Sequence, residues 1–370
     1  MRFSSPLLPG VLTGSFDHFW SADLIYDGLQ RLADVPLTQP KFGETASATV
    51  QQDGLCTIVW TDLFGRSMSP REVSDAFTPF GAQMRVYSNV TAGPFLERTQ
   101  FGVFEITDVP SAHDEDMQFR GQRITTGSRI ELELKELTAG VGEETFDVPS
   151  APSDLASTWD EVARVTGLQL VRSIDDVPIS RSILYPDSKL EATYDLFEIM
   201  LDAVPHMTAD GALSARPNEW PVPVTTLRRG DQGQLISVGQ SMSAALYNRV
   251  VVRATGTDQE SVLAFAEITD GPLRVRNADG SLSPFRARTL YLSSEYVTTQ
   301  VQAQAWADST LLQVSKQRSR IVPVVMTFDP LLERGDVVLI ERPQETLTGR
   351  VLTVERSDRG RQSLTVEVAS

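Results

Sequence analysis

Cysteine and histidine, which build many metal and thiol sites, are scarce in the chain. Its only cysteine is Cys56, so neither an internal disulfide nor a cysteine pair for zinc can form. The three histidines, His18, His113 and His206, are far apart in the sequence and lack the spacing of the H-E-x-x-H zinc motif. We therefore predict no bound metal and no cofactor. Cys56 lies in an apolar stretch and is expected to be a small buried core residue, which fits folding in a reducing cytosol.

Long hydrophobic runs are also missing. No apolar run approaches the roughly 20 residues that cross a bilayer as a helix. Pro6 and Pro9 interrupt the N-terminal segment, which lacks the apolar centre of a secretory signal. The sequence therefore predicts no membrane insertion and no export leader.

The usual linear motifs of catalysis are absent. Neither a P-loop nor a G-x-G-x-x-G phosphate-binding motif occurs. The run Gly239–Ser243 lacks the final glycine of the G-x-S-x-G nucleophile motif. The run Asp114–Asp116 lacks the alternating ligands and the terminal glutamate of a calcium loop. These absences predict a protein that is not an enzyme.

Two other functions stay open at this stage. A cell-wall or polysaccharide hydrolase needs a pair of carboxylates, which has no linear signature, and the chain has 49 acidic residues to choose from. A carbohydrate-binding receptor protein needs exposed aromatic side chains, for which Trp20 and Trp220 are candidates. Packing in a core or an interface is the commoner role of tryptophan.

Positive charge is scarce relative to negative charge. The 33 Lys and Arg residues against 49 Asp and Glu residues give a formal net charge of −16. This balance argues against a sequence-reading nucleic-acid binder and against binding to an anionic membrane, because both need a footprint of Lys and Arg. An acidic channel would instead repel DNA and let it slide through. The alternative explanation is that the net charge keeps the protein soluble.

The β-strand signal dominates the first 148 residues. At 370 residues with 41% hydrophobic residues, the chain is long enough for several cores. Alternating apolar residues at Met84–Val90 and Ile130–Leu134 predict strands with one wet face. Strand-like segments flank Asp53-Gly54, which predicts a hairpin turn there. His113 is expected near an exposed hairpin tip.

A small helical module is predicted after the composition changes near Val148–Ser153. Two capping boxes, Thr158-x-x-Glu161 and Ser188-x-x-Glu191, predict the starts of two helices. Gly167 is a plausible end of the first helix.

The β pattern returns at about Leu235. Arg249–Arg253 is a predicted strand, and a helix is predicted from about Thr298 to Lys316. The expected buried stripe of this helix is Val301, Ala305, Trp306 and Leu312. The tail predicts strands at Ile321–Thr327, Val337–Ile340, Gly349–Glu355 and Leu364–Val368.

The same short β pattern occurs once in each half of the chain, at residues 80–109 and 333–355. Each copy is a glycine turn, a short strand, a loop, a second glycine and a returning strand. Gly81 and Gly335 are predicted to hold equivalent turns, and Gly102 and Gly349 to open the returning strands. Either true duplication or chance explains the match. With true duplication, three chains would supply six similar domains for one ring.

Five segments in the same order resemble the tail-hub family of tailed bacteriophages. They are Leu24–Gly28, Asp75–Gly81, Phe101–Thr107, Tyr247–Val252 and Asp329–Val338. The family includes the minor tail proteins of long-tailed actinobacterial phages and, more distantly, the baseplate hub protein of contractile-tailed phages. The resemblance covers most of the chain, and the order and spacing of the segments carry it.

The resemblance implies a fold of the α+β class, mainly β, with two tube-like β-barrel domains and a small helical module between them. The expected domains are 1–148, an N-terminal β-barrel; 149–234, a helix-containing accessory domain and connector; and 235–370, a C-terminal β-barrel with a long helix.

The function that the resemblance implies is structural. A homotrimer would form the hub at the distal tail tip of the virion, after assembly in the host cytoplasm. The expected partners are a distal tail protein or tail tube protein, the tape measure protein and other tail-tip proteins. Genomic DNA would pass through without sequence-specific binding.

Overall fold

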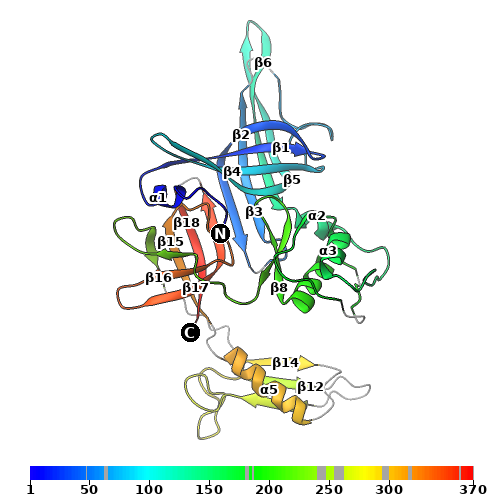
Figure 1. The fold of residues 1–370 in the computed structure, drawn as a ribbon, viewed down its shortest axis with the longest axis vertical. Coiled ribbons are helices and arrows are strands. Elements are labelled where there is room, and N and C mark those ends of the chain that lie inside the picture. Colours follow the sequence, from blue (N-terminus) through cyan, green and yellow to red (C-terminus); the bar gives the residue numbers. More distant parts are fainter. Residues whose placement is uncertain are drawn as a thin grey trace. The chain divides into compact units, whose positions relative to one another are not determined.

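The computed structural model describes residues 1–46, 48–61, 66–179, 183–185, 187–239, 247–253, 262–293, 300–315, 319–357 and 360–369. The chain forms two compact units. The first unit contains residues 1–239 and 323–366, and the second contains residues 240–322 with the last four residues. The prediction of an α+β, mainly β fold is confirmed (Figure 1).

The N-terminal strands of the first unit close into a six-stranded barrel, called ring 1 here. Their order is β1-β4-β5-β6-β3-β2, and β1 also pairs with β2, so the sheet has no free edge at this point. Every pairing in ring 1 is antiparallel. The strands are β1 (Asp17–Tyr26), β2 (Leu29–Thr45), β3 (Gln52–Thr61), β4 (Ala82–Ala92), β5 (Phe95–Phe119) and β6 (Gln122–Glu136).

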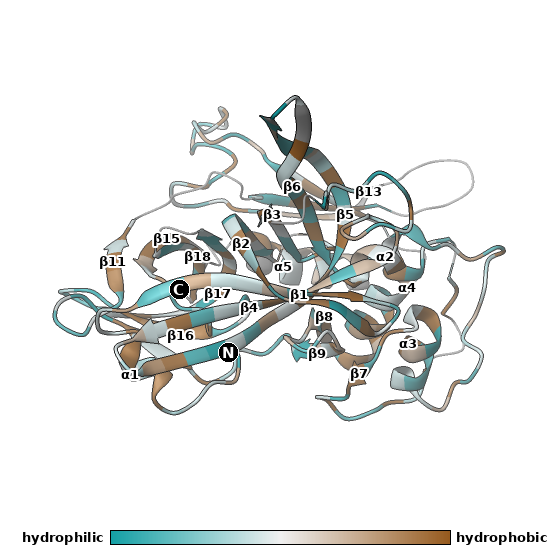
Figure 2. Cartoon of the chain, turned by 90° about the horizontal axis from the view of Figure 1, so that it is seen from above, coloured by the Kyte–Doolittle hydropathy of each residue, from teal (hydrophilic) through white to brown (hydrophobic). Residues whose placement is uncertain are grey.

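Apolar side chains fill the interior of ring 1. The predicted alternation is confirmed in β4 and β6, where Met84, Val86, Ile130 and Leu132 are all fully buried. Hydrophobic and hydrophilic residues are mixed along the strands of the sheet (Figure 2). Trp20 lies at the centre, with its ring centroid 4.8 Å from those of both Phe42 and Phe101. No path for DNA therefore runs through ring 1, because its core is packed.

Two turn predictions for ring 1 were wrong. Asp53-Gly54 lies inside β3, paired with β2 and β6, and the chain turns between Thr45 and Gln52. Gly54 is required because a Cβ there would lie 2.7 Å from the Phe42 ring. His113 is exposed but pairs with Arg129 within the β5–β6 hairpin, whose turn is at Arg120-Gly121.

The C-terminal strands form a second barrel-like ring, called ring 2 here, with the same strand order as ring 1. The strand order of ring 2 is β10-β16-β17-β18-β15-β11. If the six strands of each ring are numbered from one to six along the chain, both rings have the order 1-4-5-6-3-2. The predicted pair of barrels is thereby confirmed. The strands are β10 (Thr225–Leu227), β11 (Leu235–Val238), β15 (Ser319–Thr327), β16 (Val337–Glu341), β17 (Thr346–Ser357) and β18 (Arg361–Ala369).

Ring 2 differs from ring 1 at its first two strands, β10 and β11, which do not pair with each other among the described residues. The short strand β10 runs parallel to β16, whereas β1 runs antiparallel to β4. Among the described strands β10 and β11 share no ladder, and only the Leu235 N–H donates to the Arg228 carbonyl, at 3.0 Å. In sequence, residues 240–322 occupy the connection from β11 to β15, where ring 1 has a short turn.

The two rings share a seam of main-chain hydrogen bonds. Thr353–Ser357 of β17 pairs antiparallel with Lys41–Thr45 of β2. This pairing merges the strands of both rings into one 12-stranded sheet. The rings are therefore held to each other by backbone geometry as well as by side chains.

The predicted helical module lies between the rings in sequence and has its own apolar core around Trp159, Tyr185 and Phe197. Val103 of β5 joins this core, so β5 is buried on both faces there. A small sheet has the order β7-β9-β8. The elements are α2 (Thr138–Glu143), α3 (Thr158–Thr166), β7 (Leu170–Val171), α4 (Lys189–Asp195), η1 (Leu196–Met200), β8 (Ala203–Met207) and β9 (Leu213–Pro217); α1 (Leu8–Val11) precedes ring 1.

The helix caps correct one prediction and confirm two. Ser157, not Thr158, caps α3: its hydroxyl accepts from the Asp160 N–H at 3.0 Å, and Thr158 is the first helical residue. Thr158 instead donates to the Val177 carbonyl at 2.6 Å. Gly167 ends α3 with φ +66°, and Ser188 caps α4, as predicted.

The second unit is a three-stranded sheet covered on one face by a helix. The sheet order is β13-β12-β14, with β12 (Arg249–Arg253), β13 (Val262–Glu267) and β14 (Thr289–Ser293). The helix α5 (Gln300–Ser315) is confirmed, and of its predicted stripe Trp306 packs against the buried cluster, whereas Val301 and Ala305 are exposed. The buried residues are Ala303 and Ala307, while Val301 is 81% exposed, and the Leu312 side chain lies outside the described residues. Small alanines let the helix approach the sheet closely, which a search for large apolar residues misses.

The corrected stripe predicts how α5 responds to larger side chains. Ala303→Leu should destabilise the second unit by about 1–3 kcal/mol, because the three extra carbon atoms of leucine do not fit at a fully buried site. Ala305→Leu, on the exposed side of the same helix, is the matched control and should stay within about 0.5 kcal/mol of wild type. Native-state hydrogen exchange of the β12 amides, which report on the second unit, measures both. Equal effects of the two variants would contradict the assigned stripe.

Candidate functional site

The four predicted glycines lie before or within corresponding strands of the two rings. Gly81 precedes β4 with φ +88°, and Gly335 precedes β16 with φ +86°. Gly102 pairs with Val86, and Gly349 pairs with Val338. Both rings thus place a left-handed glycine before the fourth strand and a second glycine opposite it.

The expectation that Gly102 and Gly349 open the returning strands was wrong. β5 already begins at Phe95 and β17 at Thr346, so both glycines lie inside their strands. The turn before β5 contains Gly93, with φ +58°. In ring 1 the turn glycine, Gly93, rather than Gly102, therefore marks the start of the returning strand, and in ring 2 the turn at residues 342–345 contains no glycine.

The Asp329–Val338 segment, which was predicted only as a turn and a strand, is a buried charged loop. Asp329, Glu333, Arg334 and Asp336 are at most 6% exposed. These side chains meet charged groups from the N-terminus, from ring 1 and from the helical module. We call this cluster the charged junction; its members are Met1, Arg2, Glu44, Gln51, Glu136, His206, Arg216, Glu333, Arg334, Asp336 and Arg356.

Glu44 of β2 is the centre of the charged junction. Its Oε1 accepts from Arg2 Nη2 and from Arg356 Nη1, both at 2.8 Å. Its Oε2 accepts from the Arg334 N–H at 2.9 Å. The three side chains of Arg2, Glu44 and Arg356 are at most 1% exposed. Burial alone would raise the pKa of Glu44, but the two guanidinium groups hold it well below its usual range.

The amino terminus enters the same cluster. The Met1 ammonium lies 2.9 Å from Glu333 Oε2 and 2.7 Å from Asp336 Oδ1. Arg216 of β9 lies 3.3 Å from Glu333 Oε2. Burial opposes ionisation of Glu333, but Arg2, His206, Arg216 and the ammonium lower its pKa to about 2. The carboxylate is therefore charged and fully paired.

Hydrogen bonds extend the charged junction into the helical module. Arg334 Nη2 donates to Gln51 Oε1, and Gln51 Nε2 donates to the Tyr194 hydroxyl at 2.7 Å. The Gln51 N–H donates to Glu136 Oε1 at 2.9 Å. Burial raises the pKa of Glu136, the last carboxyl of β6. Both rings and the module thus share one network of buried polar groups.

A buried network of this kind contributes specificity more than net stability. Removing several charges from water costs several kcal/mol per ion, and only near-complete pairing offsets that cost. Any other relative placement of the rings would leave buried Arg or Glu groups without partners. The charged junction can therefore fix the orientation of ring 1, ring 2 and the module to one another.

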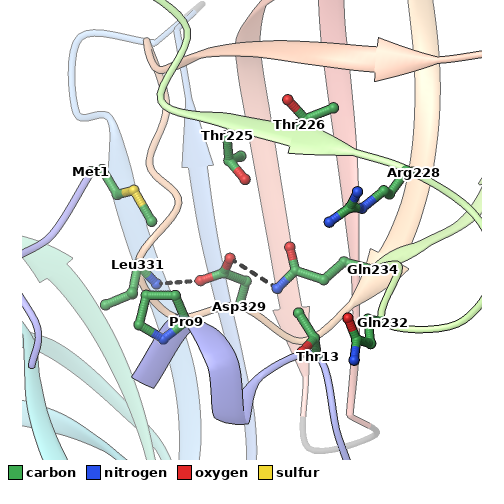
Figure 3. A pocket seen from close by; sticks show the side chains of 10 residues that line it. All are labelled: Met1, Pro9, Thr13, Thr225, Thr226, Arg228, Gln232, Gln234, Asp329 and Leu331. Atoms are coloured by element: carbon green, nitrogen blue, oxygen red, sulfur yellow. Dashed lines mark hydrogen bonds between the residues drawn. The ribbon is translucent and has the colours of Figure 1, made fainter. Parts of the chain in front are cut away.

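A polar cavity of about 240 Å³ lies at the incomplete closure of ring 2 (Figure 3). Thr225, Thr226 and Arg228 line it from β10 and the following turn, and Gln234 from the β11 side. Asp329 lies at its inner end, where its carboxylate accepts from Gln234 Nε2 at 3.3 Å and from the Leu331 N–H at 2.9 Å. The cavity can hold a few waters or a small polar group.

The candidate residues for other chemistry are dispersed or buried. Within the described ranges no group of three His, Cys, Asp or Glu residues could hold a metal ion. Trp20 is 2% exposed in the core of ring 1, so it cannot stack on a sugar, whereas Trp220 is 36% exposed. The Gln240–Ser243 part of the run at 239–243 lies outside the described residues. No helix among the described residues is long and apolar enough to cross a membrane.

One local feature of the sequence does indicate the charged junction. Charged residues at Glu333, Arg334 and Asp336 directly follow an apolar Leu-Leu pair and precede a strand of five residues rich in valine and leucine. Three charged residues that close to a buried strand are expected to pair with other charged groups. Their partners Arg2, Glu44 and Arg356 are distant in sequence and have no local signature.

The two left-handed glycines generate a test of the charged junction. Gly81→Ala and Gly335→Ala should both cost about 1–2 kcal/mol, because an alanine is strained at positive φ. Gly335→Ala should cost more, since its Cβ would lie 2.5 Å from Arg216 Nη1, whereas the Gly81 site has only Tyr26 at 3.8 Å. Thermal unfolding measures the difference. A Gly81 variant as destabilised as the Gly335 variant would contradict the close approach of Arg216.

Two buried histidines predict the pH dependence of stability. Burial lowers the pKa of His18 and, together with Arg216, that of His206, each to about 3. Histidines of the unfolded chain bind protons near pH 6.5, so stability should fall as pH drops from about 6.5 towards 3. Each histidine contributes up to about 1.4 kcal/mol per pH unit.

His206→Gln should therefore remove about half of this slope between pH ~5 and ~6, above the range in which most carboxylates titrate. The exposed His113→Gln is the matched control and should leave the slope unchanged. Urea unfolding at several pH values measures it. An unchanged slope for His206→Gln would mean that His206 is already protonated in the folded protein.

Comparison with solved structures shows which proteins share this fold. The crystal structure of the tail protein from Neisseria meningitidis MC58 matches with a TM-score of 0.58 at 10% identity, over 94% of this chain and 96% of that chain. The 43 kDa tail protein of prophage MuSo2 from Shewanella oneidensis matches with a TM-score of 0.56 at 13% identity, over 94% of this chain and 98% of that chain. No family model matches the sequence, and no curated protein matches it. The chain therefore has, over nearly its whole length, the fold of two tail proteins, one of them from a prophage.

Proposed function

We propose that this protein is a structural subunit of a phage tail, and that three copies form the hub at the distal tail tip. The hub would join the hexameric tail tube to the tip proteins. The observation that carries the proposal is the identical strand order of ring 1 and ring 2 in one chain. Three such chains supply six equivalent rings, which is the number needed to continue a six-fold tube from a three-fold tip.

The charged junction supports this proposal because a pseudo-six-fold wall needs the two rings at a fixed mutual rotation. A closed ring requires each neighbour to be placed by the same rotation, and small errors prevent closure. The β2–β17 seam sets the spacing of the two rings, and the Arg2–Glu44–Arg356 cluster penalises any other arrangement. A flexible linker between two barrels would not give this geometry.

The path of DNA would lie between subunits and not within one. The packed interior of ring 1 leaves the common axis of the trimer as the only route in this architecture. The net charge of −16 suits a lumen that repels the phosphate backbone and lets it slide. In this arrangement DNA would move through the channel without base-specific contacts to the protein.

The partners and the location follow from the same proposal. A distal tail protein or tail tube protein would contact one face of the hub, and the tape measure protein and other tail-tip proteins would contact the lumen and the other face. The subunits would assemble in the host cytoplasm into a virion tail. The relation to the long-tailed actinobacterial phages and to the hub of contractile tails is part of this proposal.

Electron cryomicroscopy of tails that contain this chain tests the proposal. The expected map shows three copies around the tail axis, six ring domains at similar radius, and acidic residues facing the lumen. Single copies within intact tails would contradict the trimer. A neutral or basic lumen would contradict the charge argument while leaving the trimer intact.

A further inference from the structure

Within the second unit, no described element covers the face of the three-stranded sheet that lies opposite α5. Val250 and Val252 of β12 point to α5 and pack on Ala303 and Ala307. The opposite face presents Arg249, Val251, Arg253, Phe265 and Tyr291, which we call the open face.

The open face is an ordered aromatic platform. Val251 pairs with Phe265 on one side and with Tyr291 on the other, so the three side chains form one row across the sheet. Val251 is only 5% exposed, whereas Phe265 is 50% exposed and Tyr291 is 56% exposed. The Arg249 guanidinium lies 5.3 Å from the Phe265 ring centroid, and that of Arg253 lies 4.1 Å from the Tyr291 ring centroid.

This composition is typical of the centre of a protein–protein interface. Tyrosine, phenylalanine and arginine are enriched there, and tyrosine and arginine dominate the binding free energy. Aromatic rings held on strands lose little conformational entropy on binding because they have only two side-chain torsions. Half-exposed aromatics on an isolated surface would otherwise contribute only to aggregation.

The charge of the second unit indicates what the open face contacts. Residues 240–322 and 367–370, which form the second unit, contain nine Lys and Arg and eight Asp and Glu, a net charge of +1. The whole chain carries −16, so the first unit carries −17. The strongly acidic surface that complements this unit is therefore present on every other copy of the same chain.

The small area of the open face limits the binding affinity that it can provide. Three strands of about five residues span roughly 14 by 17 Å, or about 240 Å². A stable two-body interface needs about 800 Å² per partner. The open face is thus suited to a contact inside an assembly that other interfaces also hold, where effective concentration strengthens a weak contact.

We propose that the open face of the second unit docks on the acidic unit, residues 1–239 and 323–366, of a neighbouring copy. This inference rests on the proposed function in one respect, which is that the trimer supplies a neighbouring copy. It goes further by naming the surface through which the copies make contact. The second unit, which is inserted in the connection from β11 to β15, would then hold neighbouring subunits together.

Photo-crosslinking of the full chain tests the docking. p-Benzoylphenylalanine replaces Tyr291, and a mixture of ¹⁴N- and ¹⁵N-labelled chains is irradiated and analysed by mass spectrometry. The expected result is mixed-isotope crosslinks to residues of the acidic unit. Crosslinks only within one chain, or none at concentrations where oligomers are present, would overturn the proposal. The same probe at Val301, which is 81% exposed on α5 in the same unit, is the matched control and should give few crosslinks.

Sedimentation of variants gives an independent readout. Phe265→Ser with Tyr291→Ser should weaken self-association at least tenfold, and wild-type self-association should weaken as salt is raised. Val301→Ser is the matched control and should leave self-association unchanged. If the double variant self-associates as strongly as the wild type, the docking proposal is overturned. The proposed trimer would not be overturned by that result, because it is tested separately by the number of copies seen in electron cryomicroscopy of tails. Retention of the wild type, but not of the double variant, on single-stranded DNA or cell-wall polysaccharide would overturn it in favour of another occupant.

Discussion

The buried carboxylate of Glu44 between Arg2 and Arg356 is the interaction on which the arrangement of the first unit depends. It joins the N-terminal segment, ring 1 and ring 2 at one point, with all three side chains at most 1% exposed. The pairing offsets a large desolvation cost only when all partners are in place. Its consequence is specificity: two barrels that could pack in many ways are held in one orientation. The seam between β2 and β17 has the same effect through the backbone.

Much of the architecture could be predicted from local patterns. Alternation at Met84–Val90 and Ile130–Leu134 gave strands and their inward faces, because a strand with one wet face has a period of two. Ser188 and Gly167 gave helix ends through capping chemistry. The β pattern at residues 80–109 and 333–355 marked corresponding strands of two rings with one strand order. The domain boundaries at 148 and 234, and the assembly roles of the four glycines, stay predictions.

The remaining errors share a physical origin, which is that the deciding contact is distant in sequence. Asp53-Gly54 has the composition of a turn, yet Gly54 lies within β3 because the Phe42 ring of the neighbouring strand occupies the space of a side chain. Val103 faces a module whose first element begins 35 residues later, at Thr138. Ala303 and Ala307 are buried because the sheet approaches them, a feature that hydrophobicity alone does not reveal. The charged junction is the largest case, since its partners lie at both ends of the chain.

Native-state amide hydrogen exchange tests most directly whether the charged junction and the seam hold the rings as one body. The amides of Lys41–Thr45 and Thr353–Ser357 are the reporters, compared with core amides of β4 and β6. If the account is right, the seam amides open only in the global unfolding event and exchange as slowly as the core. Fast exchange at the seam, with the core of both rings still protected, would show that the rings separate freely and would contradict it.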